Sequence, residues 1–105
     1  MYFRIILTEP FLEEYKKFFD KNELVKFYKF KEKLKSNPFI GKPLRVNFVR
    51  EFKTDKGKRA YFIVYVEFNI VLFVLLSNKK NQKPTIEKLF KYLGDYYLFA
   101  NYYSS

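Results

Sequence analysis

The chain has 105 residues and a net charge of +10, with 49% hydrophobic and 30% charged residues. This composition excludes a disordered or collagen-like chain, and the length allows one domain, residues 1–105. The sequence contains no cysteine and no histidine, so any chemistry must use Lys, Arg, Tyr, Glu, Asp or backbone groups. The positive charge favours nucleic acid, an anionic membrane surface or an acidic protein as the partner.

The first third of the chain predicts a strand and two helices. Residues 2–7 are rich in β-forming side chains, and Thr8 is a candidate cap for a helix over 9–20. Asn22 is a candidate cap for a second helix over about 23–36, which Ser36-Asn37-Pro38 ends. Because the connection is short, we expect an antiparallel helical hairpin. Residues 37–44 indicate a loop.

The rest of the chain predicts three strands and a last helix. Residues 45–53, 60–66 and 70–76 are β-rich and are separated by turn residues at 55–57 and 67–69, which favours an antiparallel meander. After a polar loop at 77–84, Thr85 is a candidate cap for the last helix. The order β-α-α-β-β-β-α indicates an α+β domain. The hairpin should cover one face of the sheet, and the last helix the other face or an edge.

No apolar run reaches the ~18–20 residues that span a bilayer, and residues 1–20 lack the pattern of a signal peptide. We therefore expect a cytoplasmic protein that has no membrane partner.

The cations are concentrated in two segments. Residues 41–59 hold seven cations against two anions, and residues 78–91 hold five against one, so they carry +5 and +4 of the total. If the strands are neighbours, these cations converge on one face of the sheet. Period two places Arg59, Tyr61 and Tyr65 on one face. Cations interleaved with tyrosine suit RNA, and packing in the core is the competing interpretation for both tyrosines.

One carboxylate lies among these cations. Glu51 stands between Arg50 and Lys53, and a carboxylate held by cations stays ionised and can accept a proton from a ribose hydroxyl. A surface salt bridge is the competing interpretation. A register shift of one residue in this strand would exchange Arg50 and Glu51 on the active face.

Several short motifs follow this order of elements. Asn37-Pro38 ends the hairpin, Gly41-Lys42-Pro43-Leu44 leads into the sheet, and the strands carry Val49-Arg50-Glu51-Phe52-Lys53 and Gly57-Lys58-Arg59-Ala60-Tyr61. Over nearly the whole chain the pattern resembles the RelE/ParE superfamily of toxins from toxin–antitoxin systems. The resemblance implies a small basic toxin, without a cofactor, that a co-expressed acidic antitoxin neutralises.

The RelE-like branch of that family implies cleavage of mRNA in the ribosomal A site without a metal ion. A base takes the proton of a ribose 2′-hydroxyl, cations stabilise the phosphate, and an acid protonates the leaving 5′-oxygen. The resemblance assigns phosphate stabilisation to Arg59 and the base to Glu51, with Lys53 as the alternative. Lys79 and Lys80 match the end of the fourth strand, which often carries the acid. Tyr65 or Tyr92 would replace a tyrosine that the family often has after that strand. The expected catalytic residues are Arg59, Glu51, Lys53, Lys80 and Tyr65, and the expected RNA-binding residues are Arg45, Arg50, Lys56, Lys58, Tyr61, Lys79 and Lys83.

Two other functions fit the same resemblance. One is a ParE-like toxin that inhibits gyrase and catalyses no reaction, and the other is a non-catalytic member that binds RNA or an antitoxin. The aromatic C-terminal segment favours a site for the antitoxin or for a homodimer, and packing of half of it on the sheet is the competing interpretation. The expected partner residues are Tyr92, Tyr96, Tyr97, Phe99 and Tyr103.

Overall fold

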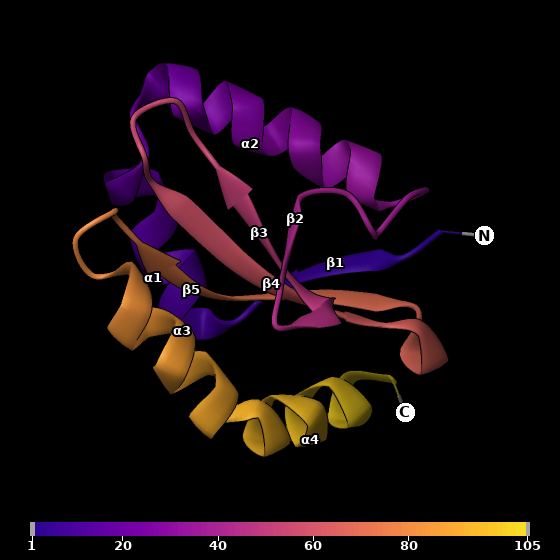
Figure 1. The fold of residues 1–105 in the computed structure, drawn as a ribbon. Coiled ribbons are helices and arrows are strands. Elements are labelled where there is room, and N and C mark those ends of the chain that lie inside the picture. Colours follow the sequence, from indigo (N-terminus) through magenta and orange to yellow (C-terminus); the bar gives the residue numbers. More distant parts are fainter. Residues whose placement is uncertain (1, 105) are drawn as a thin grey trace.

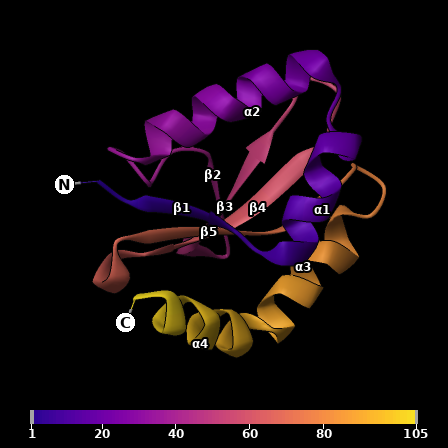
Figure 2. The same cartoon turned by 180° about the vertical axis from the view of Figure 1, so that it is seen from behind.

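The computed structural model describes residues 2–104, which form one mixed sheet between two pairs of helices (Figures 1 and 2). The elements in chain order are β1 (Arg4–Leu7), α1 (Glu9–Phe18), α2 (Lys21–Leu34), β2 (Lys42–Leu44), β3 (Val46–Lys53), β4 (Arg59–Tyr65), the 3₁₀ turn η1 (Val66–Phe68), β5 (Ile70–Ser77), α3 (Gln82–Lys91) and α4 (Leu93–Ser104). The strand order is β1-β5-β4-β3-β2. β1 runs parallel to β5, and the other neighbours are antiparallel.

This architecture confirms the expected α+β class and the meander of β3, β4 and β5. The helical hairpin covers one face of the sheet, and the C-terminal helices cover the other (Figures 1 and 2). The structure adds the short strand β2, which lies at the edge within the segment expected to be a loop. It also divides the expected last helix into α3 and α4 at Tyr92, whose backbone N–H bonds back to Lys88 and Phe90.

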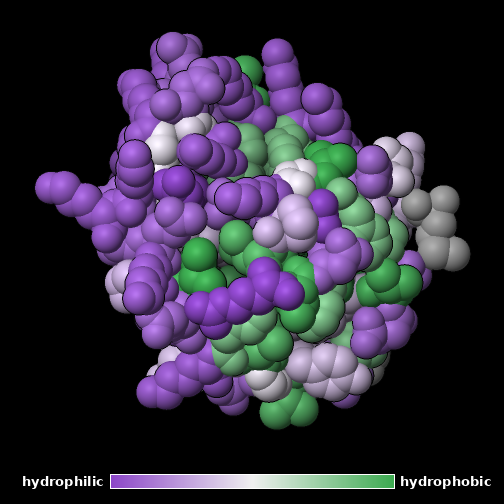
Figure 3. All heavy atoms as spheres, viewed as in Figure 1, coloured by the Kyte–Doolittle hydropathy of each residue, from purple (hydrophilic) through white to green (hydrophobic). Residues whose placement is uncertain are grey.

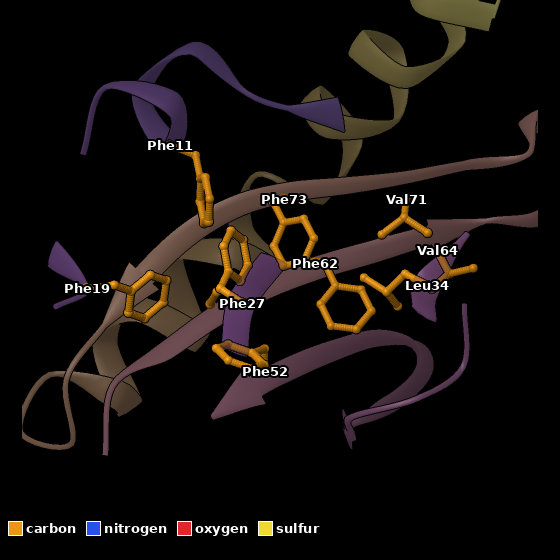
Figure 4. Packing of buried hydrophobic residues seen from close by; sticks show 10 residues of the cluster. Phe11, Phe19, Phe27, Leu34, Phe52, Phe62, Val64, Val71 and Phe73 are labelled. Carbon is orange, nitrogen blue, oxygen red and sulfur yellow. The ribbon is translucent and has the colours of Figure 1, made fainter. Parts of the chain in front are cut away.

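Phenylalanine rings fill the core between the sheet and the helical hairpin (Figure 4). The Phe27 ring of α2 lies 5.1 Å from Phe73, 5.3 Å from Phe19 and 5.5 Å from Phe52, measured between ring centroids. Each such pair adds about 0.5–1.5 kcal/mol beyond the burial of its area. This core accounts for ten of the 24 aromatic residues in the sequence.

The second core lies between the sheet and the C-terminal helices. It holds Tyr61, Ile63 and Tyr65 of β4 against Leu89 of α3 and Ala100 of α4. Because both faces of β4 are covered, every residue of that strand is buried, which explains the apolar run that follows Arg59. The expected common face of Tyr61 and Tyr65 is confirmed.

The helix starts differ from those expected. Asp20, and not Asn22, is the N-cap of α2. Its carboxylate accepts from the Glu23 N–H at 2.8 Å, and the Glu23 carboxylate accepts from the Asp20 N–H at 2.9 Å. Thr85 lies inside α3, whose cap position is Asn81. Thr8 does precede α1, but its hydroxyl makes no capping bond. None of the helices within residues 2–104 has the length and apolar character needed to cross a bilayer.

Candidate nucleic-acid interface

Charged side chains meet at the end of the sheet where β4 begins. Lys53 of β3 faces Arg59 of β4, and Arg59 faces Ser77 of β5. In the next row Glu51 faces Tyr61 on one side and Lys42 of β2 on the other. Residues directly opposite each other in antiparallel strands point to the same face. These six side chains therefore share the face of the sheet that α3 and α4 cover.

A β-bulge brings Ser77 to this face. Tyr61 pairs with Leu75 while Phe62 pairs with Phe73, so Val74 has no partner residue on β4. The extra residue reverses the alternation of β5, because Ile70 and Leu72 face the C-terminal helices before it and Leu75 faces them after it. The Ser77 hydroxyl consequently lies 2.7 Å from the Tyr61 hydroxyl.

We call Glu51, Arg59, Tyr61 and Ser77 the polar cluster. Glu51 is 3% exposed and Arg59 is 6% exposed. Arg59 Nη1 donates to the Gly57 carbonyl at 2.6 Å, and Arg59 Nε lies 3.8 Å from Glu51 Oε2. Burial raises the pKa of Tyr61, which the hydrogen bond to Ser77 partly offsets. Within residues 2–104, Arg59 Nε and Glu51 Oε1 are buried and have no hydrogen-bond partner.

A groove of about 410 Å³ adjoins the loop that follows β5, and we call it the cationic groove. One wall is the corner between β2 and β3, and the other is the loop after β5 with the start of α3. In the strand order β3 and β4 lie between these walls. Four of its lining residues are cations and none is an acid. The lining residues are Pro43, Leu44, Arg45, Lys79, Lys80, Gln82, Lys83 and Ile86.

Both walls of the groove are held in place. Arg45 has a φ of 60°, and its guanidinium stacks 4.9 Å from the ring centroid of Phe90 on α3. This left-handed conformation is unusual for a residue with a side chain and often occurs at functional sites. On the opposite wall, the Asn78 N–H donates to the Asn81 side chain at 2.9 Å, and the Asn81 N–H donates to the Asn78 side chain at 3.1 Å. This reciprocal pair fixes the loop that carries Lys79 and Lys80.

Arg50 does not belong to the interface, which corrects its expected RNA-binding role. It points to the face of α2, and its guanidinium donates to the carbonyls of Ile40, Gly41 and Asn47 at 3.0 Å each. Gly41 has a φ of 83°, and a Cβ there would lie 2.5 Å from the Glu51 carbonyl oxygen. Arg50 therefore fastens the loop before β2 to the sheet.

Lys56 and Lys58 are also placed away from the groove. The Lys56 ammonium pairs with Asp20 at the start of α2. Lys58 Nζ donates to the Phe18 carbonyl at 2.7 Å and to the Glu23 carboxylate at 2.9 Å. Both lysines connect the β3–β4 turn to the helical hairpin and do not line the cationic groove, so their contact with RNA stays a prediction.

The two tyrosines of β4 are both buried. Tyr61 is fully enclosed, so only its hydroxyl takes part in the polar cluster, and its ring cannot stack on a base. Tyr65 lies at the opposite end of β4, about 20 Å from Arg59 at ~3.3 Å per residue. Its ring packs against Phe68 and Tyr97, and burial raises its pKa well above the ordinary value. Tyr65 is therefore not a catalytic residue of this site.

The C-terminal aromatic side chains divide between the core and the surface. Tyr96 and Phe99 pack against the sheet with Ala100, whereas Tyr92, Tyr97 and Tyr103 are exposed. Two of the five expected partner residues therefore belong to the core, and three remain accessible to a partner.

Sequence reasoning left Lys42, Ser77, Asn78 and Asn81 out of the site. Lys42 could have been found only with the β2–β3 register, and Ser77 only with the bulge. The spacing of Asn78 and Asn81 on either side of two lysines is the one local signal in the sequence. No group of three His, Cys, Asp or Glu side chains within residues 2–104 is arranged to hold a metal ion.

The fold is that of RelE toxins, as comparison with solved structures shows. A free double mutant of E. coli toxin RelE matches with a TM-score of 0.67 and 16% identity, over 85% of this chain and 99% of that one. A crystal form of isolated E. coli RelE matches with a TM-score of 0.64 and 18% identity, over 87% of this chain and 98% of that one.

A third match is a double mutant of E. coli RelE in complex with a peptide of the antitoxin RelBc. Its TM-score is 0.64 at 18% identity, over 74% of this chain and 84% of that one. No protein-family model matches the sequence, and no curated protein is significantly similar to it. The chain therefore has a RelE-like toxin fold.

Proposed function

We propose that the chain is the toxin of a toxin–antitoxin pair and cleaves mRNA on the ribosome. The observation that carries this proposal is the gathering of cations at the end of the sheet where β4 begins. Lys53, Arg59 and the lysines after β5 come from three neighbouring strands and meet at one end of the sheet. Fixed cations stabilise the charge that develops on a phosphate under attack. The RelE-like fold supports the same function.

The proposed reaction needs a base, a phosphate ligand and an acid. The base takes the proton of the 2′-hydroxyl, whose oxygen attacks the adjacent phosphorus and forms a 2′,3′-cyclic phosphate. The 5′-oxygen leaves and takes a proton from the acid. Lys53 fits the base better than Glu51, because Lys53 is exposed in the row of Arg59 whereas Glu51 is buried against Arg59. Arg59 is the proposed phosphate ligand, and Lys80 is the proposed acid.

An acidic antitoxin is the proposed partner. The net charge of +10 favours an acidic protein. The solved complex of E. coli RelE with an antitoxin peptide supports an antitoxin as the partner of a chain with this fold. Bound over the cationic groove, such a partner would exclude RNA.

Cleavage on purified ribosomes tests the proposed reaction. The purified chain is added to ribosomes programmed with a defined mRNA, and primer extension locates new ends. We expect the wild-type chain to cut within the A-site codon and Lys53→Met to lose about 10²–10⁴-fold in rate, the usual contribution of a general base. Glu51→Gln should lose less than Lys53→Met.

Lys29→Met is the matched control, because Lys29 is an exposed lysine on α2, which covers the opposite face. Its rate should stay close to that of the wild-type chain. Intact mRNA with a folded wild-type chain would contradict the proposal. Inhibition of gyrase in a supercoiling assay would then support the ParE-like alternative.

A further inference from the structure

The surface around α4 differs from the rest of the molecule in its charge. Residues 60–78 and 92–105 contain no lysine or arginine, and their charged residues are Glu67 and Asp95. Arg4 borders this surface where its guanidinium donates to the Tyr103 carbonyl at 2.7 Å. In a chain of net charge +10, this region is neutral to weakly acidic.

The same surface is apolar and contains a hollow. The hollow has a volume of about 320 Å³ and lies where the start of β3, the end of β4, η1 and α4 meet, with Phe48, Val66 and Tyr97 among its lining residues. Exposed apolar side chains surround it. We call Val46, Phe48, Val66, Tyr97, Leu98, Tyr102 and Tyr103 the α4 surface.

The exposed area of the α4 surface is large for a monomer. With about 150–250 Å² per aromatic side chain, the exposed fractions of Phe48, Tyr97, Tyr102 and Tyr103 alone leave roughly 300–500 Å² open to solvent. Val46, Val66 and Leu98 add further apolar area. The largest apolar patch of a typical monomer covers about 300–600 Å². Standard protein interfaces bury about 800 Å² on each partner. Figure 3 shows hydrophilic residues over the upper and left parts of one side of the molecule, with hydrophobic and pale ones toward the centre and lower right.

We infer that the α4 surface binds a second copy of the chain. Two copies of a +10 chain repel each other through most surfaces, and this surface carries few cations, with Arg4 and Arg45 at its borders. A two-fold interface places the same patch on both sides, so each copy offers both a hollow and protruding side chains. Leu98 adjoins Tyr97 at the hollow and is 65% exposed, which suits it to enter the hollow of the other copy.

The α4 surface and the lining of the cationic groove share no residue, and they adjoin where Arg45 precedes Val46. The inference does not depend on the proposed function, and its test does not use cleavage.

Sedimentation velocity over a range of concentrations measures this association. The wild-type chain should sediment as a dimer at tens of micromolar. Val66→Lys should raise the dissociation constant at least tenfold. Val25→Lys is the matched control, because Val25 on α2 is 50% exposed and Val66 is 56% exposed, and both variants add one charge. Circular dichroism checks that both variants are folded.

The dependence on salt distinguishes this dimer from an association of two chains that nucleic acid bridges. Because salt screens the repulsion between two +10 chains, the dimer should become tighter between about 50 and 500 mM NaCl. Bridging by nucleic acid weakens over the same range. A monomer at every concentration, equal effects of Val66→Lys and Val25→Lys, or an association that salt weakens would overturn the inference.

Discussion

Arg50 of β3 and Arg59 of β4 point to opposite faces of the sheet, and this difference separates a structural arginine from a candidate site arginine. Arg50 shares its face with Phe62 and donates to three backbone carbonyls, whereas Arg59 shares its face with Tyr61 and Glu51. Period two predicted the face of Arg59 within its own strand. It could not decide the face of Arg50, because that depends on the register of β3 against β4, which no local pattern defines.

Arg50→Met should destabilise the fold. The change removes the guanidinium that donates to the carbonyls of Ile40, Gly41 and Asn47, and a hydrogen bond to a charged group contributes about 1.5–3 kcal/mol. We expect the free energy of unfolding, measured by urea denaturation, to fall by about 2–4 kcal/mol. Lys29→Met, which removes an exposed lysine, should change it by less than about 0.5 kcal/mol. An equal stability of both variants would contradict the structural role of Arg50.

At the scale of elements, residue propensities and turn residues predicted which helices and strands exist, but they did not predict how the strands pair. The existence of the hairpin, the meander and a C-terminal helix followed from apolar periodicity and turn residues. The bulge at Val74 did not, because nothing in Ile70-Val71-Leu72-Phe73-Val74 distinguishes the residue that loses its partner. The start of α2 was missed because Asp20 was assigned to the connection, although Glu23 completes a capping box with it.

The connection between the β3–β4 turn and α2 should make stability depend on pH. Burial acts to raise the pKa of Glu23, but hydrogen bonds from the Asp20 N–H, Thr54 and Lys58 outweigh it, so the pKa lies below its ordinary value of 4.5. The folded chain therefore holds this proton less tightly than the unfolded chain. The resulting stability is present above the ordinary pKa and is lost as the pH falls through the folded one.

Glu23→Gln should flatten this dependence. We expect the wild-type chain to lose more stability than the variant between about pH 5 and pH 3, measured as the urea midpoint at each pH. Glu32→Gln is the control, because Glu32 forms a more exposed pair with Lys35 on the same helix. Parallel pH profiles of the wild-type chain and Glu23→Gln would show that the carboxylate of Glu23 does not stabilise the fold.

At the scale of the whole molecule, charge and topology together define the candidate site. The sequence located nearly all the excess charge in two segments, and the fold brings part of each to the cationic groove. The fold also pairs Lys56 and Lys58 with Asp20 and Glu23 at the helical hairpin. Composition could not predict these pairs, because the partners are remote in the sequence.

Binding of single-stranded RNA should depend on salt through the lysines of the groove. Each phosphate contact contributes a slope of about −0.7 to the logarithm of the association constant against the logarithm of salt concentration. Replacing Lys79, Lys80 and Lys83 with Gln should therefore reduce the slope by about 2. The same change at the exposed lysines Lys16, Lys29 and Lys33 should leave it nearly unchanged. Fluorescence anisotropy at several salt concentrations measures both slopes. Equal slopes for the two variants would show that RNA does not bind at the lysines of the groove.

The most direct test of the central claim is the mapping of transcript ends in growing cells. Cells express the wild-type chain, Arg59→Ala or Lys29→Met, and sequencing locates the new 5′ ends. The account predicts growth arrest with cuts inside translated codons for the wild-type chain and Lys29→Met, and intact transcripts with continued growth for a folded Arg59→Ala. Arrest of growth with intact transcripts, or equal cutting by Arg59→Ala, would contradict it.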